Sequence, residues 1–337
     1  MERDAAGAGL NGRRDWDEDD VRVRPGRASR PRTRIRPKHD DAVTGFVIAV
    51  DRGRFTCRVT DRDGDRTVTA MRARELGRKA VVVGDRVGLV SDVTGRPDTL
   101  ARIVRISERT SVLRRTADDD DPYERVVVAN ADQLVIVTAL ADPPPRTGFV
   151  DRCLVAAYDA GLEPLLCLTK ADLVEGTNVL PDLLAHYAAL DFGAVTCRYD
   201  EPPDALRAAL ADHISVLVGH SGVGKSTLVN VLVPDQHRAT GVVSAIGKGR
   251  HTSTSAVALE LAGGGWVVDT PGIRSFGLAH VSPESLLTGF HDLVEGAAEC
   301  PPGCGHLGAE CALDAWVAAG HASAARLASY RRLLASR

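Results

Sequence analysis

The sequence lacks several features that would assign it to a class at once. It contains no long apolar run and its first residues are charged, so we expect neither a membrane-spanning helix nor a secretory signal peptide. Its seven cysteines do not have the spacing of a disulfide framework, which indicates a cytoplasmic protein of a reducing compartment. The formal net charge is only −3, which excludes nucleic-acid binding through an overall basic surface. Any such contact must therefore be local.

Lysine is scarce, with only five among the 42 basic residues. Three of these five, Lys170, Lys225 and Lys248, lie in or beside the motifs described below. The excess of arginine, together with abundant Ala, Val and Gly, is typical of a GC-rich genome and indicates no function by itself. With 337 residues, 44% of them hydrophobic, the chain is long enough for two or three domains with cores of their own.

Residues 1–40 show almost no apolar periodicity. An acidic run at 15–20 is followed by a segment, 21–38, with eight basic residues and no acidic one. This composition predicts a disordered Arg-rich arm. The sequence leaves open whether the arm contacts RNA phosphates or is a solvated tail without a specific role.

Residues 42–106 contain five short alternating runs separated by turn signals, at 44–50, 55–59, 67–71, 81–90 and 101–104. Five short strands in so few residues predict a small β-barrel, with the OB-fold as the expected topology. Residues 41–106 carry 13 basic and 9 acidic residues, and only Phe46 and Phe55 could stack on bases. Contact with RNA through shape and phosphates is therefore favoured over reading of a base sequence.

The pattern becomes α/β in residues 112–283, where apolar runs alternate with amphipathic segments. The expected strands are 133–140, 165–168, 194–196, 214–218 and 265–268, and the expected helices are 151–160, 181–190 and 204–211. Alternation of this kind predicts a parallel sheet with right-handed crossovers. Residues 284–337 are expected to form an α-helical C-terminal module, in which 318–337 contains four arginines and no acidic residue.

Between a predicted strand and a predicted helix, residues 219–226 read G-x-x-x-x-G-K-S, the phosphate-binding loop of P-loop NTPases. Backbone N–H groups of this loop and the start of the helix would hold a phosphate chain. Lys225 would contact the β- and γ-phosphates, and the Ser226 hydroxyl would bind Mg²⁺. The expected phosphate-binding residues are Gly219, His220, Ser221, Gly222, Val223, Gly224, Lys225, Ser226 and Thr227. The alternative, a glycine-rich turn that binds nothing, is disfavoured by the flanking strand and helix.

Two further segments complete a phosphate site. Asp269-Thr270-Pro271-Gly272 is a D-x-x-G motif at the end of a predicted strand, in which Asp269 would hold Mg²⁺ through water and the Gly272 N–H would contact the γ-phosphate. Residues 248–254 are glycine-rich and polar, and they have the position of a first switch loop. A hydroxyl of this loop, from Thr252 or Ser253, would complete the Mg²⁺ coordination.

The segment Thr169-Lys170-Ala171-Asp172 indicates which base the nucleotide carries, because it is similar to the N-K-x-D guanine motif of GTPases. A carboxylate at Asp172 can accept from guanine N1–H and N2–H₂, a donor pair that adenine lacks. The Lys170 stem would cover one face of the base, and Thr196 and Cys197 are expected in the loop on the other side. Because Thr169 replaces the usual asparagine, the sequence leaves open whether this position is bonded to the P-loop.

The order of these motifs is unusual. The guanine motif and the base-side loop precede the P-loop, whereas they follow it in ordinary GTPases. The sequence therefore predicts a circularly permuted GTPase domain between a β-barrel and the C-terminal module.

Three cysteines and one histidine near the end of the chain, Cys300, Cys304, His306 and Cys311, form a set of four metal ligands. Three thiolates and an imidazole predict a closed, structural Zn²⁺ site, because four protein ligands leave no position open for catalysis. Unligated loop cysteines are the alternative.

The layout from about residue 42 to 320 resembles the RsgA family of small ribosomal subunit biogenesis GTPases, also called the YjeQ family. The motifs that carry the resemblance are 169–172, 219–226, 249–253, 269–272 and the Cys/His cluster. The resemblance implies an OB-fold at 42–106, a permuted GTPase domain at 112–283 and a zinc module at 284–337. It also implies GTP hydrolysis that is stimulated by the small ribosomal subunit, contact with its rRNA, and a role in late maturation of that subunit. We expect a monomer that uses GTP with Mg²⁺ and contains one Zn²⁺.

Many GTPases place a glutamine directly after D-x-x-G to orient the attacking water, but this chain has Ile273. The resemblance implies that His251 replaces that glutamine as the catalytic residue. Two other functions stay open: a passive RNA-binding scaffold with a vestigial nucleotide site, and a permuted GTPase that acts on another ribonucleoprotein. Lys225, Ser226 and Asp269 argue against a vestigial site, and the guanine motif argues against an ATPase or a P-loop kinase.

Overall fold

The computed structural model describes residues 39–77, 80–116, 123–188, 190, 192–233, 256–270, 277–308 and 311–335. The chain divides into two units, 1–38 and 39–337, and the described helices and strands belong to the second. The predicted Arg-rich arm lies outside the described residues except for 39–40, as does the predicted switch loop 248–254. Among the described residues, no helix has the length and apolar character that crossing a bilayer requires.

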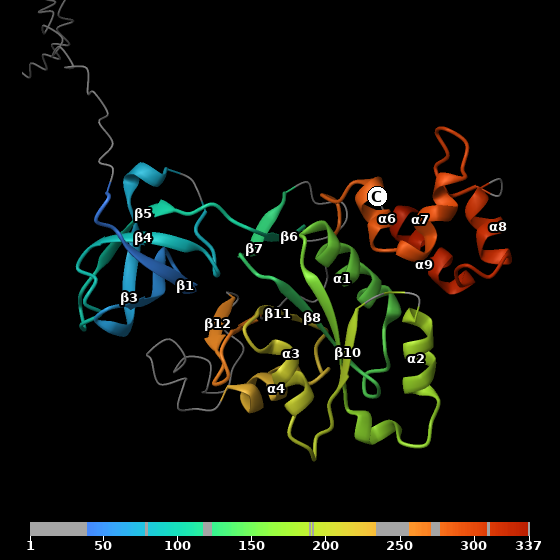
Figure 1. The fold of residues 1–337 in the computed structure, drawn as a ribbon, viewed down its shortest axis with the longest axis horizontal. Helices are drawn as coiled ribbons and strands as arrows, with labels where there is room; N and C mark the ends of the chain where they lie inside the picture. Colours follow the sequence, from blue (N-terminus) through green and yellow to red (C-terminus); the bar gives the residue numbers. More distant parts are fainter. Residues whose placement is uncertain are drawn as a thin grey trace, which may run out of the picture. The chain divides into compact units, whose positions relative to one another are not determined.

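The first part of the described chain is a five-stranded barrel, as predicted (Figure 1). Its strands are β1 (Val43–Asp51), β2 (Arg54–Asp61), β3 (Gly64–Arg72), β4 (Arg86–Ser91) and β5 (Ala101–Ile106), and a short helix, η2 (Arg74–Leu76), follows β3. The strand order is β1-β2-β3-β5-β4, and a β1–β4 pairing closes the barrel. Alternate residues point inward, as Phe55, Cys57 and Val59 of β2 do, and they form a hydrophobic core of their own.

The prediction of a strand over 81–90 is wrong in its first half, because β4 begins at Arg86. Gly84 has a φ of +91°, and a Cβ at that position would lie 1.9 Å from the Ala129 carbonyl oxygen. Asp85 is fully buried, where its carboxylate accepts from the Val82 N–H and from the Arg109 guanidinium. This tight turn interrupts the apolar run, so that Val83 makes only an isolated bridge to Val128.

A hairpin that the sequence did not predict connects the barrel to the next layer. Its strands are β6 (Val112–Arg115) and β7 (Arg125–Ala129). The Asn130 amide after β7 donates to the Gly84 carbonyl at 2.8 Å and accepts from the Thr110 N–H. The hairpin is therefore bonded to the turn before β4.

The central part is the expected α/β layer, with strand order β10-β9-β8-β11-β13-β12. The first five of these strands run parallel, and β12 is antiparallel to β13. The strands are β8 (Gln133–Ala139), β9 (Glu163–Thr169), β10 (Gly193–Thr196), β11 (Ile214–Val218), β12 (Val257–Glu260) and β13 (Trp266–Asp269). The helices are α1 (Thr147–Asp159), η3 (Ala171–Val174), α2 (Val179–Tyr187), α3 (Asp204–Leu210) and α4 (Lys225–Leu232). The carboxyl ends of the parallel strands share one edge, where ligands bind in open α/β sheets.

Strand β12, which the sequence did not predict, joins the two sheets. Val257 of β12 pairs with Ala49 of β1, so that the barrel continues the edge of the α/β sheet. Arg58 of β2 lies 3.2 Å from Glu260 at the end of β12. The Phe46 and Trp266 rings also meet across this junction, with centroids 5.1 Å apart.

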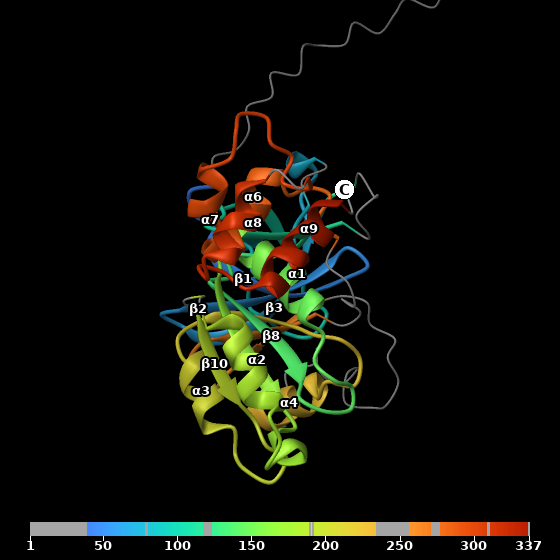
Figure 2. The same cartoon turned by 90° about the vertical axis from the view of Figure 1, so that its right-hand side faces the viewer.

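The C-terminal part of the described chain is helical, with α6 (Pro283–Thr288), α7 (His291–Ala298), α8 (Ala312–Ala318) and α9 (Ala324–Ala335). The Ser282 hydroxyl caps α6 by accepting from the Ser285 N–H. Helix α1 lies between the sheet and these helices, as Figures 1 and 2 show, and it packs against α6 and α9. The apolar residues of this interface belong to the same hydrophobic cluster as those of β8 and β9.

A buried ion pair reinforces this interface. Arg326 of α9 is 2% exposed, and its guanidinium donates to the fully buried Asp151 of α1 at 2.9 Å. It also donates to Asp292 of α7 at 3.2 Å and to the Gly289 carbonyl at 3.1 Å, and it lies over the Phe290 ring. Arg326 thus connects three helices. It is one of the four arginines of the segment 318–337, which contains no acidic residue.

Candidate functional site

The residues of the predicted P-loop lie between the carboxyl end of β11 and the first turn of α4, as the sequence predicted. A Cβ at Gly219 would lie 2.6 Å from the Val137 carbonyl oxygen, so only glycine fits between β11 and β8 at this point. Helix α4 begins at Lys225, and Ser226 and Thr227 of its first turn are exposed. The free N–H groups of this turn are therefore available to a phosphate chain.

Lys225 and Asp269 meet at the same sheet edge. The Lys225 ammonium lies 3.0 Å from the Asp269 carboxylate and donates to the Thr270 carbonyl at 3.1 Å. The Thr270 hydroxyl in turn donates to the Leu217 carbonyl of β11. These bonds hold a cation and a carboxylate beside the P-loop, which are the groups that a Mg²⁺-bound polyphosphate needs.

Thr169, at the end of β9, makes the link that the sequence left open. Its hydroxyl donates to the carbonyl oxygen of Val223 in the P-loop at 2.6 Å, and the residue is 4% exposed. The next residue, Lys170, has a φ of +58° and its ammonium donates to the Asp142 carbonyl. The threonine therefore ties the predicted guanine motif to the P-loop.

Asp172 lies in η3, opposite the predicted base-side loop. Its carboxylate accepts from the Tyr199 N–H at 3.2 Å. Cys197 is bonded on both sides, since its N–H donates to the Leu168 carbonyl at 2.7 Å and its carbonyl accepts from the Ala171 N–H at 3.2 Å. Thr196, the last residue of β10, is exposed. The residues predicted to bind the base therefore come together on neighbouring strand ends.

Sequence reasoning missed Arg198, which connects the two segments of this base site. Its guanidinium bonds to Glu175, just after η3, and to Asp200 and Glu201 beyond the base-side loop. The sequence did contain a signal for this role, because Arg198 is a cation that directly follows the predicted base-side residues.

Four predicted residues lie outside the described residues. These are His251, Thr252 and Ser253 of the switch loop, and Gly272 of the D-x-x-G motif.

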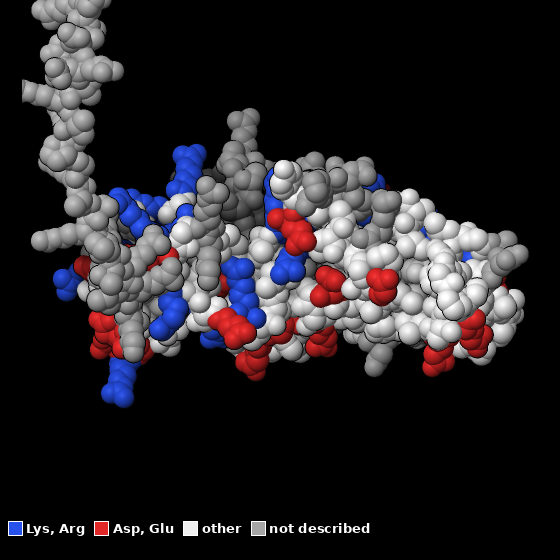
Figure 3. All heavy atoms as spheres, turned by 90° about the horizontal axis from the view of Figure 1, so that it is seen from above, with Lys and Arg blue, Asp and Glu red and all other residues white. Residues whose placement is uncertain are grey.

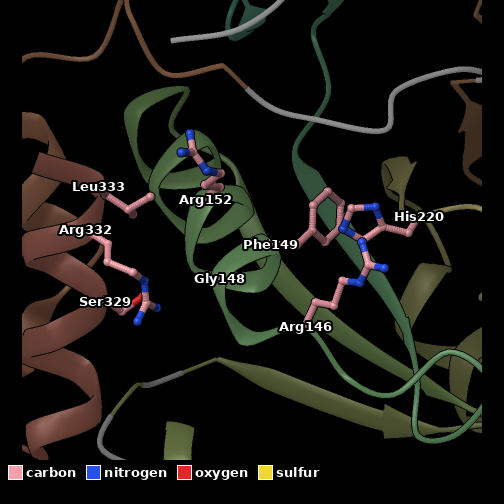
Figure 4. A pocket seen from close by; sticks show the side chains of 8 residues that line it. All are labelled: Arg146, Gly148, Phe149, Arg152, His220, Ser329, Arg332 and Leu333. Atoms are coloured by element: carbon pink, nitrogen blue, oxygen red, sulfur yellow. The ribbon is translucent and has the colours of Figure 1, made fainter. Parts of the chain in front are cut away.

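A groove of about 600 Å³ lies beside the P-loop, between the start of α1 and helix α9 (Figure 4). The His220 ring packs against Phe149 of α1, with centroids 4.1 Å apart. Burial, and secondly the charge of Arg146, lower the pKa of His220, so this imidazole is neutral at pH 7. His220 thus contributes packing and a backbone group to the P-loop. Three arginines line the groove: Arg146, Arg152 and Arg332.

The four predicted zinc ligands also come together, in the loop between α7 and α8. All four ligand atoms lie within 4.8 Å of one another. The Cys300 sulfur is 3.6 Å from the Cys311 sulfur and 3.5 Å from His306 Nδ1, and the Cys311 sulfur is 3.5 Å from the same nitrogen. A tetrahedral ion with zinc–sulfur bonds of about 2.3 Å gives sulfur–sulfur edges of about 3.8 Å, so these residues fit Zn²⁺.

Arg331 of α9 stabilises this cluster from outside. Its guanidinium donates to the His306 carbonyl at 2.9 Å and is held by both carboxylate oxygens of Asp314 at 2.8 Å. Burial raises the pKa of Cys311 to about 11, whereas a hydrogen bond from the His306 backbone lowers that of Cys304. A bound cation would draw off the remaining thiol protons, and Arg331 would offset part of the resulting negative charge.

The sequence of residues 106–279 matches the family RsgA GTPase. A curated relative, the small ribosomal subunit biogenesis GTPase RsgA of Chlorobaculum parvum, is 39% identical over 306 residues, which cover 87% of this chain and 96% of the relative.

Two solved structures have the same fold. The crystal structure of YjeQ from Thermotoga maritima has a TM-score of 0.69 and 26% identity, and the match covers 87% of this chain and 97% of that one. YloQ, described as a circularly permuted GTPase, has a TM-score of 0.67 over 88% of this chain and 96% of its own. At 23% identity, the second match is an argument about fold alone.

Proposed function

The chain belongs to the RsgA GTPase family, and on this premise we propose that it hydrolyses GTP to GDP and phosphate during late maturation of the small ribosomal subunit. The subunit stimulates this reaction in our proposal. One observation carries the proposal beyond family membership: the Thr169 hydroxyl bonds to Val223, which makes the guanine motif and the P-loop parts of a single site.

In this site, each group acts where charge or selectivity is needed. Lys225 would leave Asp269 to bind the β- and γ-phosphates, and Ser226 and Asp269 would hold Mg²⁺. Thr252 or Ser253 would also hold Mg²⁺, and the Gly272 N–H would contact the γ-phosphate. Asp172 selects guanine through its N1–H and N2–H₂ donors, and Lys170, Thr196 and Cys197 enclose the base.

We assign His251 to the attacking water. Ile273 follows the D-x-x-G motif and has no group that can orient a water molecule. A neutral imidazole can accept a proton from water near neutral pH. Binding of the subunit would place the His251 imidazole at the attacking water, which explains why stimulation is needed.

The structural part of the proposal concerns the flanking modules. We propose domains at 42–106, 112–283 and 284–337, with the barrel as an OB-fold because its strand order closes β1 on β4. The Cys300, Cys304, His306 and Cys311 cluster holds one structural Zn²⁺. The protein acts as a cytoplasmic monomer.

Contact with rRNA is assigned to the barrel. Arg86, Arg102 and Arg105 on β4 and β5 are exposed, and Figure 3 shows basic side chains at the barrel end, with acidic ones among them. The C-terminal arginines offer less exposed positive charge for rRNA contact than their number implies. Arg326 is buried and Arg331 is bonded to Asp314, which leaves Arg332 as the exposed arginine of the described part of α9.

The test is hydrolysis of GTP and of ATP by the full chain, titrated with purified small subunits and with large subunits as the control. We expect slow hydrolysis of GTP alone, a marked increase with small subunits, and no hydrolysis of ATP. Binding of small subunits without hydrolysis would support the scaffold function instead. Stimulation by another ribonucleoprotein, and not by the small subunit, would support a permuted GTPase with a different target.

A further inference from the structure

Two thiols lie together beneath the predicted base site, and neither sulfur has a chemical role in the proposed reaction. The sulfurs of Cys167 in β9 and of Cys197 just after β10 are 3.8 Å apart. Cys167 is fully buried and Cys197 is 5% exposed. Of the other described cysteines, Cys57 and Cys153 lie in different hydrophobic clusters, and three belong to the metal cluster.

The backbone of Cys197 connects this thiol pair to the guanine motif. Its N–H is bonded to Leu168 at the end of β9, and its carbonyl is bonded to the N–H of Ala171, the neighbour of Asp172. Two residues further on, the Tyr199 N–H donates to the Asp172 carboxylate. A shift of Cys197 therefore moves the groups that position Asp172.

The two thiols differ in reactivity. The contact between the two sulfurs lowers the pKa of Cys197 and raises that of Cys167, which is also the more deeply buried of the two. The thiolate is the nucleophilic form of cysteine. Cys197, the thiol nearer to solvent, is thus the first to react, and Cys167 is placed to attack it afterwards.

We propose that Cys167 and Cys197 form an oxidation site at which a hydroperoxide creates a reversible disulfide that blocks the guanine site. The Cys197 thiolate attacks one peroxide oxygen, the O–O bond breaks, and Cys197 becomes a sulfenic acid while hydroxide leaves. The Cys167 sulfur then attacks the Cys197 sulfur, the S–O bond breaks, and water leaves with the Cys167 proton. Together, two thiols lose two electrons to one hydrogen peroxide, which becomes two waters.

The disulfide would close the site because the sulfurs must approach to about 2.05 Å. Cys167 lies inside β9, which is paired with β8 on one side and β10 on the other, so it cannot move easily. Cys197 follows the last residue of β10 and must make most of the movement. This displaces the Ala171 and Tyr199 N–H groups and, with them, Asp172. A bound guanine holds the same loop in place and slows the oxidation.

The effect of the disulfide on guanine binding rests on the proposed function, whereas formation of the disulfide does not. The experiment treats the full zinc-loaded chain with hydrogen peroxide, with and without GTP, and blocks free thiols before trypsin digestion and mass spectrometry. Trypsin yields the peptides 153–170 and 171–198, which contain Cys167 and Cys197. We expect these peptides to be linked, more slowly with GTP present, and a dithiol to separate them.

Affinity for GTP is measured on the same samples. We expect the dissociation constant to rise at least about tenfold on oxidation, the factor for losing one hydrogen bond to a charged group, and to recover with dithiol. Cys153→Ala is the matched control for the second cysteine of peptide 153–170, and it should behave like the parent.

Cys167→Ala should bind GTP like the reduced parent and should lose this tenfold response. Any effect of oxidising the zinc ligands persists in this variant. The difference between the parent and the variant in the change of GTP affinity therefore measures the effect of the thiol pair alone. If the alanine variant does not fold, the Cys167→Ser variant is used for the same test. Unlinked peptides would overturn the proposal, as would a linked protein with unchanged GTP affinity. Failure of the reduced parent to bind GTP would instead refute the proposed function, and the peptide analysis would still decide the disulfide.

Discussion

At the scale of single residues, Thr169 determines how the two halves of the nucleotide site are connected. The guanine motif usually has asparagine at this position, and the sequence could not show whether a shorter hydroxyl reaches the P-loop. The acceptor, Val223, is 54 residues away in the chain, and the 2.6 Å bond depends on the spacing of β9 and β11 in the folded sheet.

Thr169→Val tests this bond, because valine keeps the shape and removes the donor. The Val223 carbonyl then loses its partner in a buried position, which costs about 1 kcal/mol and should weaken GTP binding about fivefold. Urea unfolding and a GTP titration measure the two effects. Thr169→Ser keeps the hydroxyl and should stay close to the parent in both. Equal losses in the two variants would show that packing, and not the hydrogen bond, is responsible.

His251→Ala tests the assignment of the attacking water. We expect nearly unchanged binding of GTP and of small subunits, together with loss of most of the subunit-stimulated rate, because the imidazole acts only on the water. Lys225→Ala, in contrast, should lose nucleotide binding itself. Single-turnover GTP hydrolysis with and without small subunits separates these outcomes. A variant lacking His251 that is stimulated as strongly as the parent would assign the water to another group.

At the scale of elements, α9 shows how a charge count can mislead. The sequence predicts a helical segment with four arginines and no acidic residue over 318–337, but it does not show which arginines point inward. Arg326 faces Asp151 of α1, which lies 175 residues earlier, and only tertiary packing brings the two together. The helix was predictable from local pattern, and its role as the joint between α1 and the C-terminal helices was not.

Arg326→Met should destabilise this joint strongly. It leaves the Asp151 and Asp292 carboxylates without their guanidinium in a position where each side chain is at most 2% exposed. Breaking a buried ion pair from one side costs about 3–5 kcal/mol. Urea unfolding measures the loss. Arg332→Met, a change at an exposed position of the same helix, is the matched control and should have little effect.

Removal of zinc should loosen the segment between α7 and α8. No disulfide joins the described cysteines, so a bound ion would be the link that holds this loop together. Metal analysis should find about one zinc per chain, and Cys304→Ser or a chelator should remove it and speed hydrogen exchange in 299–311. The exchange of the barrel strands should not change. A metal-free protein with the same protection in this segment would contradict a structural role.

At the scale of the whole molecule, the sequence predicted the modules and missed their connections. The barrel and the α/β sheet follow from alternating and continuous apolar runs, which are local signals. The β6–β7 hairpin and the β1–β12 pairing depend on contacts between distant segments, and β12 is only four residues long. The candidate nucleotide and metal residues could be proposed from the sequence because their chemistry demands fixed residue types at short spacing. The Cys167–Cys197 and Arg326–Asp151 pairs, in contrast, arise only from the fold.

Binding to small subunits should depend on salt if the barrel contacts rRNA phosphates. Counterion release makes the logarithm of affinity fall with the logarithm of salt concentration. A variant with Arg102→Gln and Arg105→Gln should bind small subunits more weakly. The slope of its log affinity against log salt concentration should be smaller by about 1 for each phosphate that the variant no longer neutralises. GTP affinity in the absence of subunits, which does not involve these positions, is the internal control. An unchanged slope would place the RNA-binding surface elsewhere.

The pairing of β1 with β12 also protects the GTPase sheet from unwanted association. Strand β12 lies at the end of that sheet, and its residues Val257, Ala258 and Leu259 are buried. Val257 is the residue of β12 that pairs with β1, so loss of the barrel would expose this end of an apolar edge strand to pairing with another chain. The barrel therefore acts as an edge cover as well as a module. A shortened chain limited to the GTPase segment would therefore be prone to aggregate. This dependence favours inheritance of the two modules together.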